Sequence, residues 1–338
     1  MTNTVFWGAL AAVGLGAAMA SADTLADVKA RGELLCGTNT GLVGFAAPDA
    51  NGRYEGFDVA WCRAIAAAVL GDPEKVSFKP LTSTNRFTAL ASGEIDILAR
   101  NTTWTFTRDV DLKQTFIGVN YYDGQGFMVA KSLGVTSARE LAGATICIQK
   151  GTTTELNLAD FFRANNMEYE PKPVETDDQA QQQFLSGACD VYTTDASGLA
   201  STRASFETPA DYVILPEIIS KEPLGPVVRQ GDDAWADIAR WTHYALIAAE
   251  ELGVTSANID ELVASSTNPE VKRLLGTEGN LGAMLGLEAD WAVKAIKAEG
   301  NYGEIFEKNI GEGSPIGLAR GLNAQWTEGG LIYAPPFR

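Results

Sequence analysis

Two successive alternations of short apolar segments and helical segments constrain the fold most strongly. In the first, strands predicted at 33–37, 76–80 and 95–99 are separated by helices predicted at 58–70 and 85–92. Strands and helices that alternate in this order favour a parallel sheet with helices on its faces. The first part of the chain is therefore expected to form an α/β unit.

A second unit repeats this plan further along the chain. Its strands are predicted at 144–149, at a segment ending at Val174, and at 190–194. Capping boxes are predicted at S-A-R-E (137–140) and at T-T-T-E (152–155), and T-D-D-Q (176–179) is expected to open a further helix. Because domains of roughly 100–200 residues are the norm, a chain of 338 residues fits two such lobes.

The C-terminal third is expected to be mostly helical. Helices are predicted at 235–252 and 288–299, each stopped by a glycine, with a helix start at N-P-E (268–270) between them. The last segment, 326–338, contains two adjacent prolines and is expected to run as an extended tail over the surface.

The N-terminus has the pattern of an export signal. Residues 5–20 are apolar, and A-S-A at 20–22 matches a signal-peptidase site. We expect a signal peptide at 1–22 and a mature chain that begins at Asp23. A buried N-terminal helix is the alternative, whereas a membrane span is disfavoured because the stretch is about as short as the shortest spans.

Charge and histidine content exclude several classes of function. The chain has 26 Lys and Arg against 43 Asp and Glu, a net charge of −17, which argues against nucleic acid or an anionic membrane as the main partner. The single histidine, His243, argues against Ser-His-Asp catalysis and His-rich metal sites. No metal and no cofactor is expected.

The four cysteines suit an oxidising compartment. Their spacings are far from C-x-x-C, which disfavours zinc and thioredoxin-type chemistry. Three pairings are possible, and we prefer Cys36 with Cys62 and Cys147 with Cys189, one disulfide in each lobe. Buried free thiols remain the alternative.

Polar and charged side chains follow the predicted strands at positions that suit a small zwitterion. R-N-T-T at 100–103 follows one strand, with Arg108 close behind, and threonine hydroxyls with an arginine fork suit a carboxylate. G-T-T at 151–153 begins a helix, where free N–H groups favour an anion. Asp195 ends another strand and could hold an ammonium group. Ligands of open parallel sheets bind beyond such strand ends, so an amino acid would fit.

Each of these features also has a purely structural explanation. Arg100 and the pair Arg108-Asp109 could form surface ion pairs, which contribute about 0–1 kcal/mol. The threonines at 152–154 could simply cap a helix, and Asp195 could cap the helix predicted at 196–204. The joint position of these groups at strand ends favours a site.

The sequence resembles the polar amino-acid solute-binding proteins of ABC transporters, the family 3 class. G-F-D-V-A-W-C-R-A-I at 56–65 is similar to the family signature, and L-A-S-G-E-I-D (90–96) and G-A-C-D-V (187–191) are similar to its two strand lead-ins. Within the family, the chain most resembles the glutamate/glutamine/aspartate/asparagine-binding and general L-amino-acid-binding components, including G-E-I-F at 303–306.

The resemblance implies an α/β, two-lobed, type II-like periplasmic binding protein with two hinge strands and a helical C-terminal extension. Crossings are expected near 120–123 and 216–221, with lobe 1 formed by 23–120 and 221–338 and lobe 2 by 121–220. It also implies a monomer located in the periplasm, with inner-membrane ABC permease subunits as partners, and no enzymatic activity.

The resemblance also implies how the backbone groups of an amino acid would be held. Arg108 matches the arginine that clamps the α-carboxylate, and Asp195 matches the aspartate that takes the α-ammonium. The small polar residues and helix-start donors that match the family positions beside them are Asn101, Thr103, Thr152 and Thr153.

Further positions are matched to the ligand's side chain. Asn39 lies on the first loop that faces the ligand, and Gln149 precedes the helix turn. T-S-T-N-R at 82–86 is similar to a segment of acidic-amino-acid binders, which makes Ser83 and Arg86 candidates for recognising a side-chain carboxylate. Arg100 is a further candidate.

These matches predict L-glutamate, L-glutamine, L-aspartate or L-asparagine as the ligand. Leu42 and Ser83 stand where some relatives place an aromatic residue, which disfavours aromatic or long basic ligands. Three alternatives stay open: a general L-amino-acid-binding protein, a periplasmic dehydratase on the same fold, and the sensor domain of a receptor.

Overall fold

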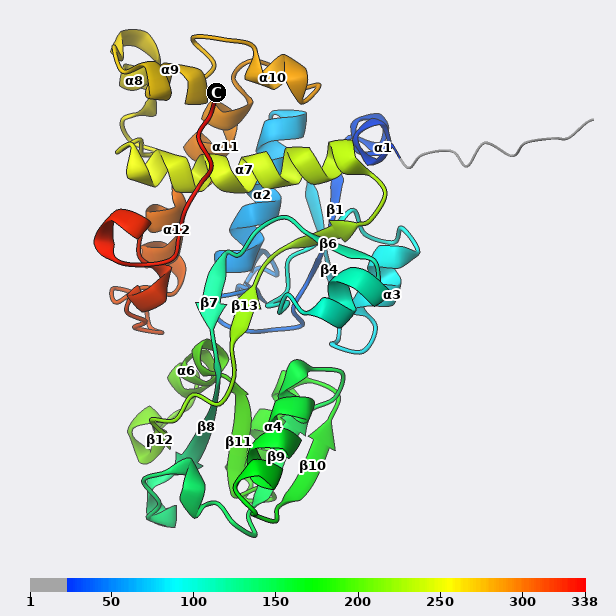
Figure 1. Cartoon of the computed structure of the whole chain (residues 1–338), viewed down its shortest axis with the longest axis vertical. Helices are drawn as coiled ribbons and strands as arrows, with labels where there is room; N and C mark the ends of the chain where they lie inside the picture. Colours follow the sequence, from blue (N-terminus) through cyan, green and yellow to red (C-terminus); the bar gives the residue numbers. More distant parts are fainter. Residues whose placement is uncertain (1–22) are drawn as a thin grey trace, which may run out of the picture.

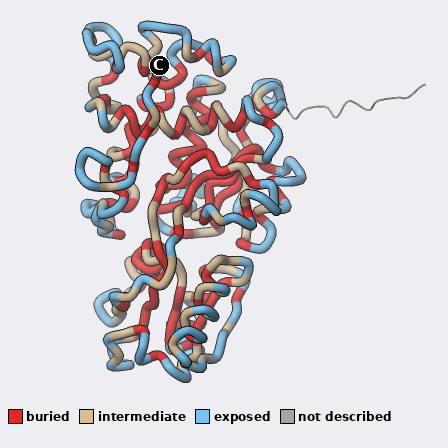
Figure 2. The backbone as a smooth tube through the Cα atoms, viewed as in Figure 1, coloured by how far each residue is buried: buried red, intermediate tan, exposed pale blue. Residues whose placement is uncertain are grey.

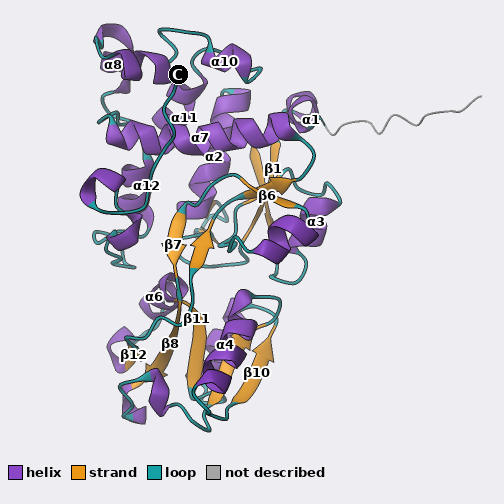
Figure 3. Ribbon diagram, viewed as in Figure 1, coloured by secondary structure: helices purple, strands orange, loops and turns teal. Residues whose placement is uncertain are grey.

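The computed structural model describes residues 23–338, which form two lobes joined by a pair of strands (Figure 1). The predicted signal peptide at 1–22 lies outside the described residues. Both lobes contain a five-stranded sheet with helices on its faces (Figure 3). The predicted α/β two-lobed architecture is confirmed.

The sheet of the first lobe has the strand order β4-β1-β5-β14-β6. In this sheet β1 is parallel to β4 and β5, and β14 is antiparallel to its two neighbours. The strands of this sheet are β1 (Leu34–Thr38), β4 (Val76–Pro80), β5 (Ile97–Leu98), β6 (Gln114–Phe116) and β14 (Val227–Arg229). The associated elements are α1 (Thr24–Arg31), the hairpin strands β2 (Ala47–Pro48) and β3 (Tyr54–Glu55), α2 (Phe57–Leu70) and α3 (Arg86–Ala91).

The second lobe repeats this arrangement with the order β10-β9-β11-β8-β12. Here β9 is parallel to β10 and β11, and β8 is antiparallel to β11 and β12. The strands are β8 (Gln125–Ala130), β9 (Thr145–Gln149), β10 (Glu170–Val174), β11 (Val191–Asp195) and β12 (Tyr212–Ile214). The helices are α4 (Thr153–Ala164), α5 (Asp177–Leu185) and α6 (Ala196–Ala204).

Two short strands carry the chain between the lobes. β7 (Tyr121–Asp123) and β13 (Glu222–Leu224) are antiparallel, and Asp123 lies opposite Glu222 (Figure 1). The sequence placed the second crossing at 216–221, just before β13. The segment ahead of β13 still belongs to the second lobe, because the N–H of Ile219 donates to the carbonyl of Gln125 at 2.9 Å.

The C-terminal helices pack onto the first lobe and share its core (Figure 2). They are α7 (Asp233–Glu251), α8 (Ile259–Ser265), α9 (Pro269–Leu274), α10 (Leu281–Met284), α11 (Trp291–Glu299) and α12 (Tyr302–Asn309). The C-terminal tail lies along α7, where Phe337 packs against Trp241. One side of it is buried in this core through Ile332, Ala334 and Phe337, whereas Leu331 and Tyr333 are exposed.

Both lobes contain a disulfide. Cys36 on β1 is bonded to Cys62 on α2, and Cys147 on β9 is bonded to Cys189 just before β11. This is the pairing that the sequence analysis preferred. The first disulfide links α2 to β1, and the second links the residues before β11 to the neighbouring strand β9.

One predicted helix start differs from expectation. The segment S-A-R-E forms a single 3₁₀ turn (Ala138–Glu140) rather than a capped α-helix. Glu140 accepts from the N–H of Thr136 instead of that of Ser137, so the reciprocal pair of a capping box does not form.

Between residues 23 and 338, no helix combines the length and the apolar character that crossing a bilayer requires. In the same residues, no group of three or more His, Cys, Asp or Glu side chains is placed to hold a metal ion.

Candidate ligand-binding site

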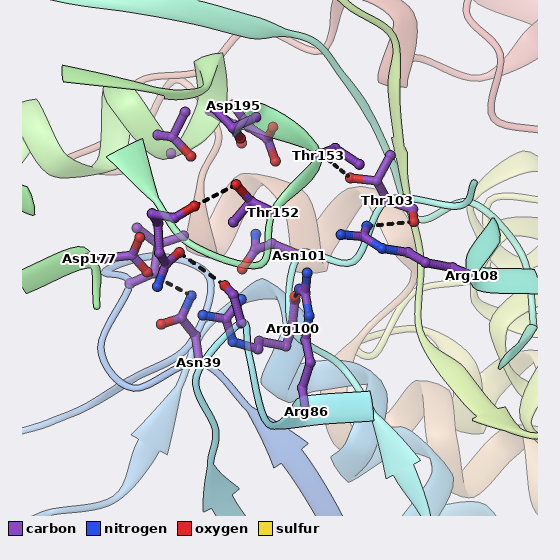
Figure 4. A pocket seen from close by; sticks show the side chains of 17 residues that line it. Asn39, Arg86, Arg100, Asn101, Thr103, Arg108, Thr152, Thr153, Asp177 and Asp195 are labelled. Atoms are coloured by element: carbon purple, nitrogen blue, oxygen red, sulfur yellow. Dashed lines mark hydrogen bonds between the residues drawn. The ribbon is translucent and has the colours of Figure 1, made fainter. Parts of the chain in front are cut away.

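One pocket between the lobes brings together all eleven residues that the sequence analysis assigned to the ligand. It contains about 460 Å³ of space not filled by protein atoms, including the solvent at its mouth. In Figure 4, arginines enter it from the first lobe, and Asp177 and Asp195 approach from the second. Six further lining residues were not assigned: Leu42, Thr154, Asp177, Thr194, Ser197 and Gly198.

The loop after β5 is held in place by the segment that resembles the family signature. Asn101 adopts a left-handed backbone (φ 41°), which Asn tolerates better than most residues, and its N–H donates to Asp58 at 2.8 Å. Burial raises the pKa of Asp58 to about 6. A glycine is required at position 56, two residues before Asp58, because a Cβ there would lie 2.3 Å from the carbonyl oxygen of Phe45.

Three buried guanidinium groups reach the pocket from the first lobe. Arg86 donates to the carbonyl of Arg100 and to Thr102 Oγ1, both at 3.3 Å. Arg100 donates from Nε to the carbonyl of Leu81 at 2.8 Å, and Arg108 donates to the carbonyl of Thr103 at 2.9 Å. The exposed fractions of the three arginines are 2%, 4% and 7%, so each is desolvated.

None of these arginines forms an ion pair within residues 23–338, which rules out the surface ion pairs considered above. Arg86 Nε and Arg100 Nη2 are buried and have no hydrogen-bond partner among the described residues. Burial lowers the pKa of Arg108 to about 10, and burial together with the neighbouring Arg108 and Arg100 lowers that of Arg86. Unpaired buried charge is costly, so an anion bound in this pocket would stabilise these groups.

Phe87, which the sequence analysis did not identify, orders two of these arginines. Its ring centroid lies 4.8 Å from Cζ of Arg86 and 5.2 Å from Cζ of Arg108. Cation–π contact at this range is favourable and keeps both side chains near one ring without neutralising either charge.

The helix start at α4 differs from the predicted capping box. Thr152 donates its hydroxyl proton backwards to the carbonyl of Gln149 at 2.7 Å, and Glu155 accepts from the N–H of Gly151 at 2.8 Å. Within the described chain, no side chain caps α4. The positive end of this helix therefore faces the pocket beside Thr152 and Thr153.

Asp195 ends β11 and lines the pocket without capping the helix that follows it. Asp123 takes that role, because its carboxylate accepts from the N–H of Ser197 at 3.3 Å. Burial and the neighbouring carboxylates of Asp123 and Glu222 raise the pKa of Asp195 well above its usual range, and Arg108 partly offsets the rise. A cation beside Asp195 would remove this repulsion.

The two lobes touch across the pocket. Asn39 Nδ2 donates to Asp177 Oδ2 at 3.3 Å, and Ser83 Oγ donates to Gln149 Oε1 at 3.1 Å. These two contacts close the pocket at the end that lies away from the crossing strands β7 and β13. Asp177 was missed because T-D-D-Q was interpreted only as a helix start, although it follows β10 just as Thr152 follows β9.

The chain matches the family model of bacterial extracellular solute-binding proteins, family 3, over residues 34–312. It is 67% identical to the glutamate/glutamine/aspartate/asparagine-binding protein BztA of Rhodobacter capsulatus, and the match covers all of both chains. It is 58% identical to the general L-amino acid-binding periplasmic protein AapJ of Rhizobium johnstonii, again over the full length of both.

A solved structure gives the same fold. A periplasmic binding protein of an ABC transporter from Brucella ovis, with glutathione bound, is 59% identical and superposes with a TM-score of 0.92. The match covers 94% of this chain and 100% of that one.

Proposed function

This chain belongs to family 3 of the bacterial extracellular solute-binding proteins, and we propose that it binds L-glutamate, L-glutamine, L-aspartate or L-asparagine for import. The single observation that carries the proposal is the set of three guanidiniums, with no ion-pair partner among the described residues, that faces Asp195 across one pocket. In this proposal Arg108 binds the α-carboxylate and Asp195 the α-ammonium.

The balance of charge favours acidic ligands within this set. Three guanidiniums and two carboxylates line the pocket, which leaves one positive charge in excess. Glutamate and aspartate carry two carboxylates and one ammonium, so either would neutralise the pocket. Arg86 and Arg100, which retain unused donors, suit the side-chain carboxylate.

Amide side chains also fit the end of the pocket near Asn39. Asp177, Asn39 and Gln149 offer a carboxylate acceptor and amide groups that both donate and accept. A side-chain amide NH₂ could donate to Asp177 while its oxygen accepts from an arginine. This mixed chemistry supports glutamine and asparagine as ligands alongside the acids.

A broader specificity is the second candidate. An outer chamber shares Ser83, Arg108, Thr152 and Thr153 with the pocket and contains about 1060 Å³ of space not filled by protein atoms, including open solvent. Phe87, Leu112 and Leu156 lie on its walls. This chamber favours binding of a larger amino-acid derivative, and the Brucella ovis protein was solved with glutathione bound.

The remaining features of the proposed function follow from the family. We propose a periplasmic, monomeric protein that delivers its ligand to inner-membrane ABC permease subunits and does not turn the ligand over. A dehydratase would need a free acid or base in the cleft, whereas here the ammonium occupies Asp195. Turnover of prephenate or arogenate, followed by absorbance, would contradict this part.

Calorimetry of protein that has been unfolded, stripped of bound ligand and refolded tests the proposal. The panel contains the four amino acids, glutathione, L-lysine and L-phenylalanine. We expect dissociation constants near micromolar, about −8 kcal/mol, for one or more of the four and no binding of lysine. Tightest binding of lysine or phenylalanine would contradict the proposal, and tightest binding of glutathione would favour the second candidate.

A further inference from the structure

Glu222 connects the two lobes through side-chain hydrogen bonds at the crossing strands. It lies on β13 and is only 1% exposed. Its Oε2 accepts from Thr103 Oγ1 of the first lobe at 2.6 Å and from Thr153 Oγ1 of the second at 2.9 Å. Its Oε1 accepts from Asn157 at 2.7 Å and from Ser220 at 2.6 Å.

These contacts determine which way the two threonine hydroxyls point. A carboxylate only accepts, so each threonine must donate its single proton to Glu222. The oxygens of Thr103 and Thr153 then have only lone pairs left to offer to the pocket, which both residues line. Hydroxyls oriented in this way accept hydrogen bonds and cannot donate to a carboxylate.

We propose that Glu222 is a positioning residue that holds the lobes closed and turns Thr103 and Thr153 into acceptors for the ligand's ammonium group. The second half of this statement rests on the proposed function, and the first does not. The proposed role of Glu222 also changes the role expected for Thr103, because the family resemblance placed Thr103 beside the α-carboxylate. Together with Asp195, these hydroxyls surround the ammonium with acceptors from both lobes.

The direct variant is Glu222→Gln, which keeps the size of the side chain but places a donor where one acceptor stood. Both threonines bond to Oε2, so an amide nitrogen at that position would turn both of their protons toward the ammonium. We expect L-glutamate to bind at least about tenfold more weakly, mainly through faster dissociation. The control is Lys221→Gln on the exposed neighbour, which should bind within about threefold of the wild type.

A double-mutant cycle tests whether Glu222 acts through a threonine. Thr153→Val removes the hydroxyl, and its loss should not add to that of Glu222→Gln, because each variant breaks the same arrangement. Thr153→Ser should recover most of the affinity that the valine variant loses. Losses that multiply in the double variant, or equal affinities of the serine and valine variants, would overturn the orientation role. The valine–serine comparison also decides this question if Glu222→Gln does not fold.

Small-angle scattering of ligand-free protein tests closure without reference to any ligand. Glu222→Gln should have a larger radius of gyration than wild type and Lys221→Gln. Equal radii would overturn the closing role of Glu222. If wild-type protein binds no amino acid but the variant is still more open, the proposed function and the ammonium role fail while the closing role stands.

Discussion

Asn39 in the first lobe donates a hydrogen bond to Asp177 in the second, with 3.3 Å between Nδ2 and Oδ2. This contact closes the pocket at the end assigned to the ligand's side chain. It also places a carboxylate next to Arg100, whose positive charge it partly balances. The choice between an acidic and an amide side chain should therefore depend on Asp177.

Asp177→Asn should increase preference for acidic ligands. Asparagine keeps an oxygen that can accept from Asn39 and removes the negative charge that repels a side-chain carboxylate. We expect the affinity ratio of L-glutamate to L-glutamine to rise by about tenfold. The exposed neighbour variant Asp178→Asn is the control. A ratio that does not change in calorimetric titrations would contradict the assigned position of the side chain.

Arg86→Met should have the opposite effect. Methionine fills the space of the arginine stem but removes the charge, so a side-chain carboxylate loses a charge-assisted hydrogen bond. We expect L-glutamate and L-aspartate to bind about 10- to 100-fold more weakly, and the two amides to lose less than about fivefold. Equal losses for all four ligands would refute side-chain recognition by Arg86.

Binding should release a proton and weaken in acid. The pKa of Asp195 lies well above its usual range in the ligand-free pocket, and an ammonium partner would lower it. The affinity should therefore fall as the pH falls through the raised value, by at most about tenfold per pH unit. Calorimetry in buffers of different ionisation enthalpy measures the released proton.

Asp123→Asn is the matched variant for this pH dependence. Asparagine can still cap Ser197 but removes the like charge that helps to raise the pKa of Asp195. The fall in affinity should shift to lower pH. A pH dependence identical to that of the wild type would exclude Asp123 as the cause.

His243 makes the stability of the first lobe sensitive to acid. It is buried, accepts from Trp61 Nε1 at 2.9 Å, and burial lowers its pKa to about 3. The unfolded chain takes up the proton near pH 6.5, so the stabilisation is complete above that pH and is lost as the pH falls toward 3.

His243→Gln lacks this titration and provides the comparison. The free energy of unfolding of the wild type, relative to the variant, should fall by about 2 kcal/mol between pH 6.5 and pH 4.5. Urea unfolding at both pH values measures this difference. Parallel pH profiles would show that His243 does not titrate on unfolding.

Strand–helix alternation predicted three of the five strands in each sheet, and strand-end chemistry together with the family resemblance predicted eleven residues of the pocket. The strand β4 (Val76–Pro80) matches the predicted bounds because its sequence, V-S-F-K-P, alternates apolar with polar residues and ends at a proline. Arg108 and Asp195 were identified because their residue types follow predicted strands and match the family pattern. The two residues belong to different lobes, and the two-lobed topology brings them into one pocket.

The residues that the sequence analysis missed depend on contacts between distant segments. Glu222 stands in a short strand without a motif, and its partners Thr103 and Thr153 lie 119 and 69 residues away. The capping box at α4 does not form, because the Thr152 hydroxyl turns toward the carbonyl of Gln149 and Glu155 accepts from Gly151 instead of Thr152. This choice of partners depends on the folded geometry, which local patterns do not contain.

Calorimetric titration of L-glutamate into ligand-free wild type, Asp195→Asn and Arg108→Met tests most directly whether one zwitterion spans the two poles. We expect near-micromolar binding by wild type and losses of at least about 100-fold in each variant, since each leaves a buried charge of the ligand without its partner. Wild-type affinity in either variant would show that the ligand does not lie between Arg108 and Asp195.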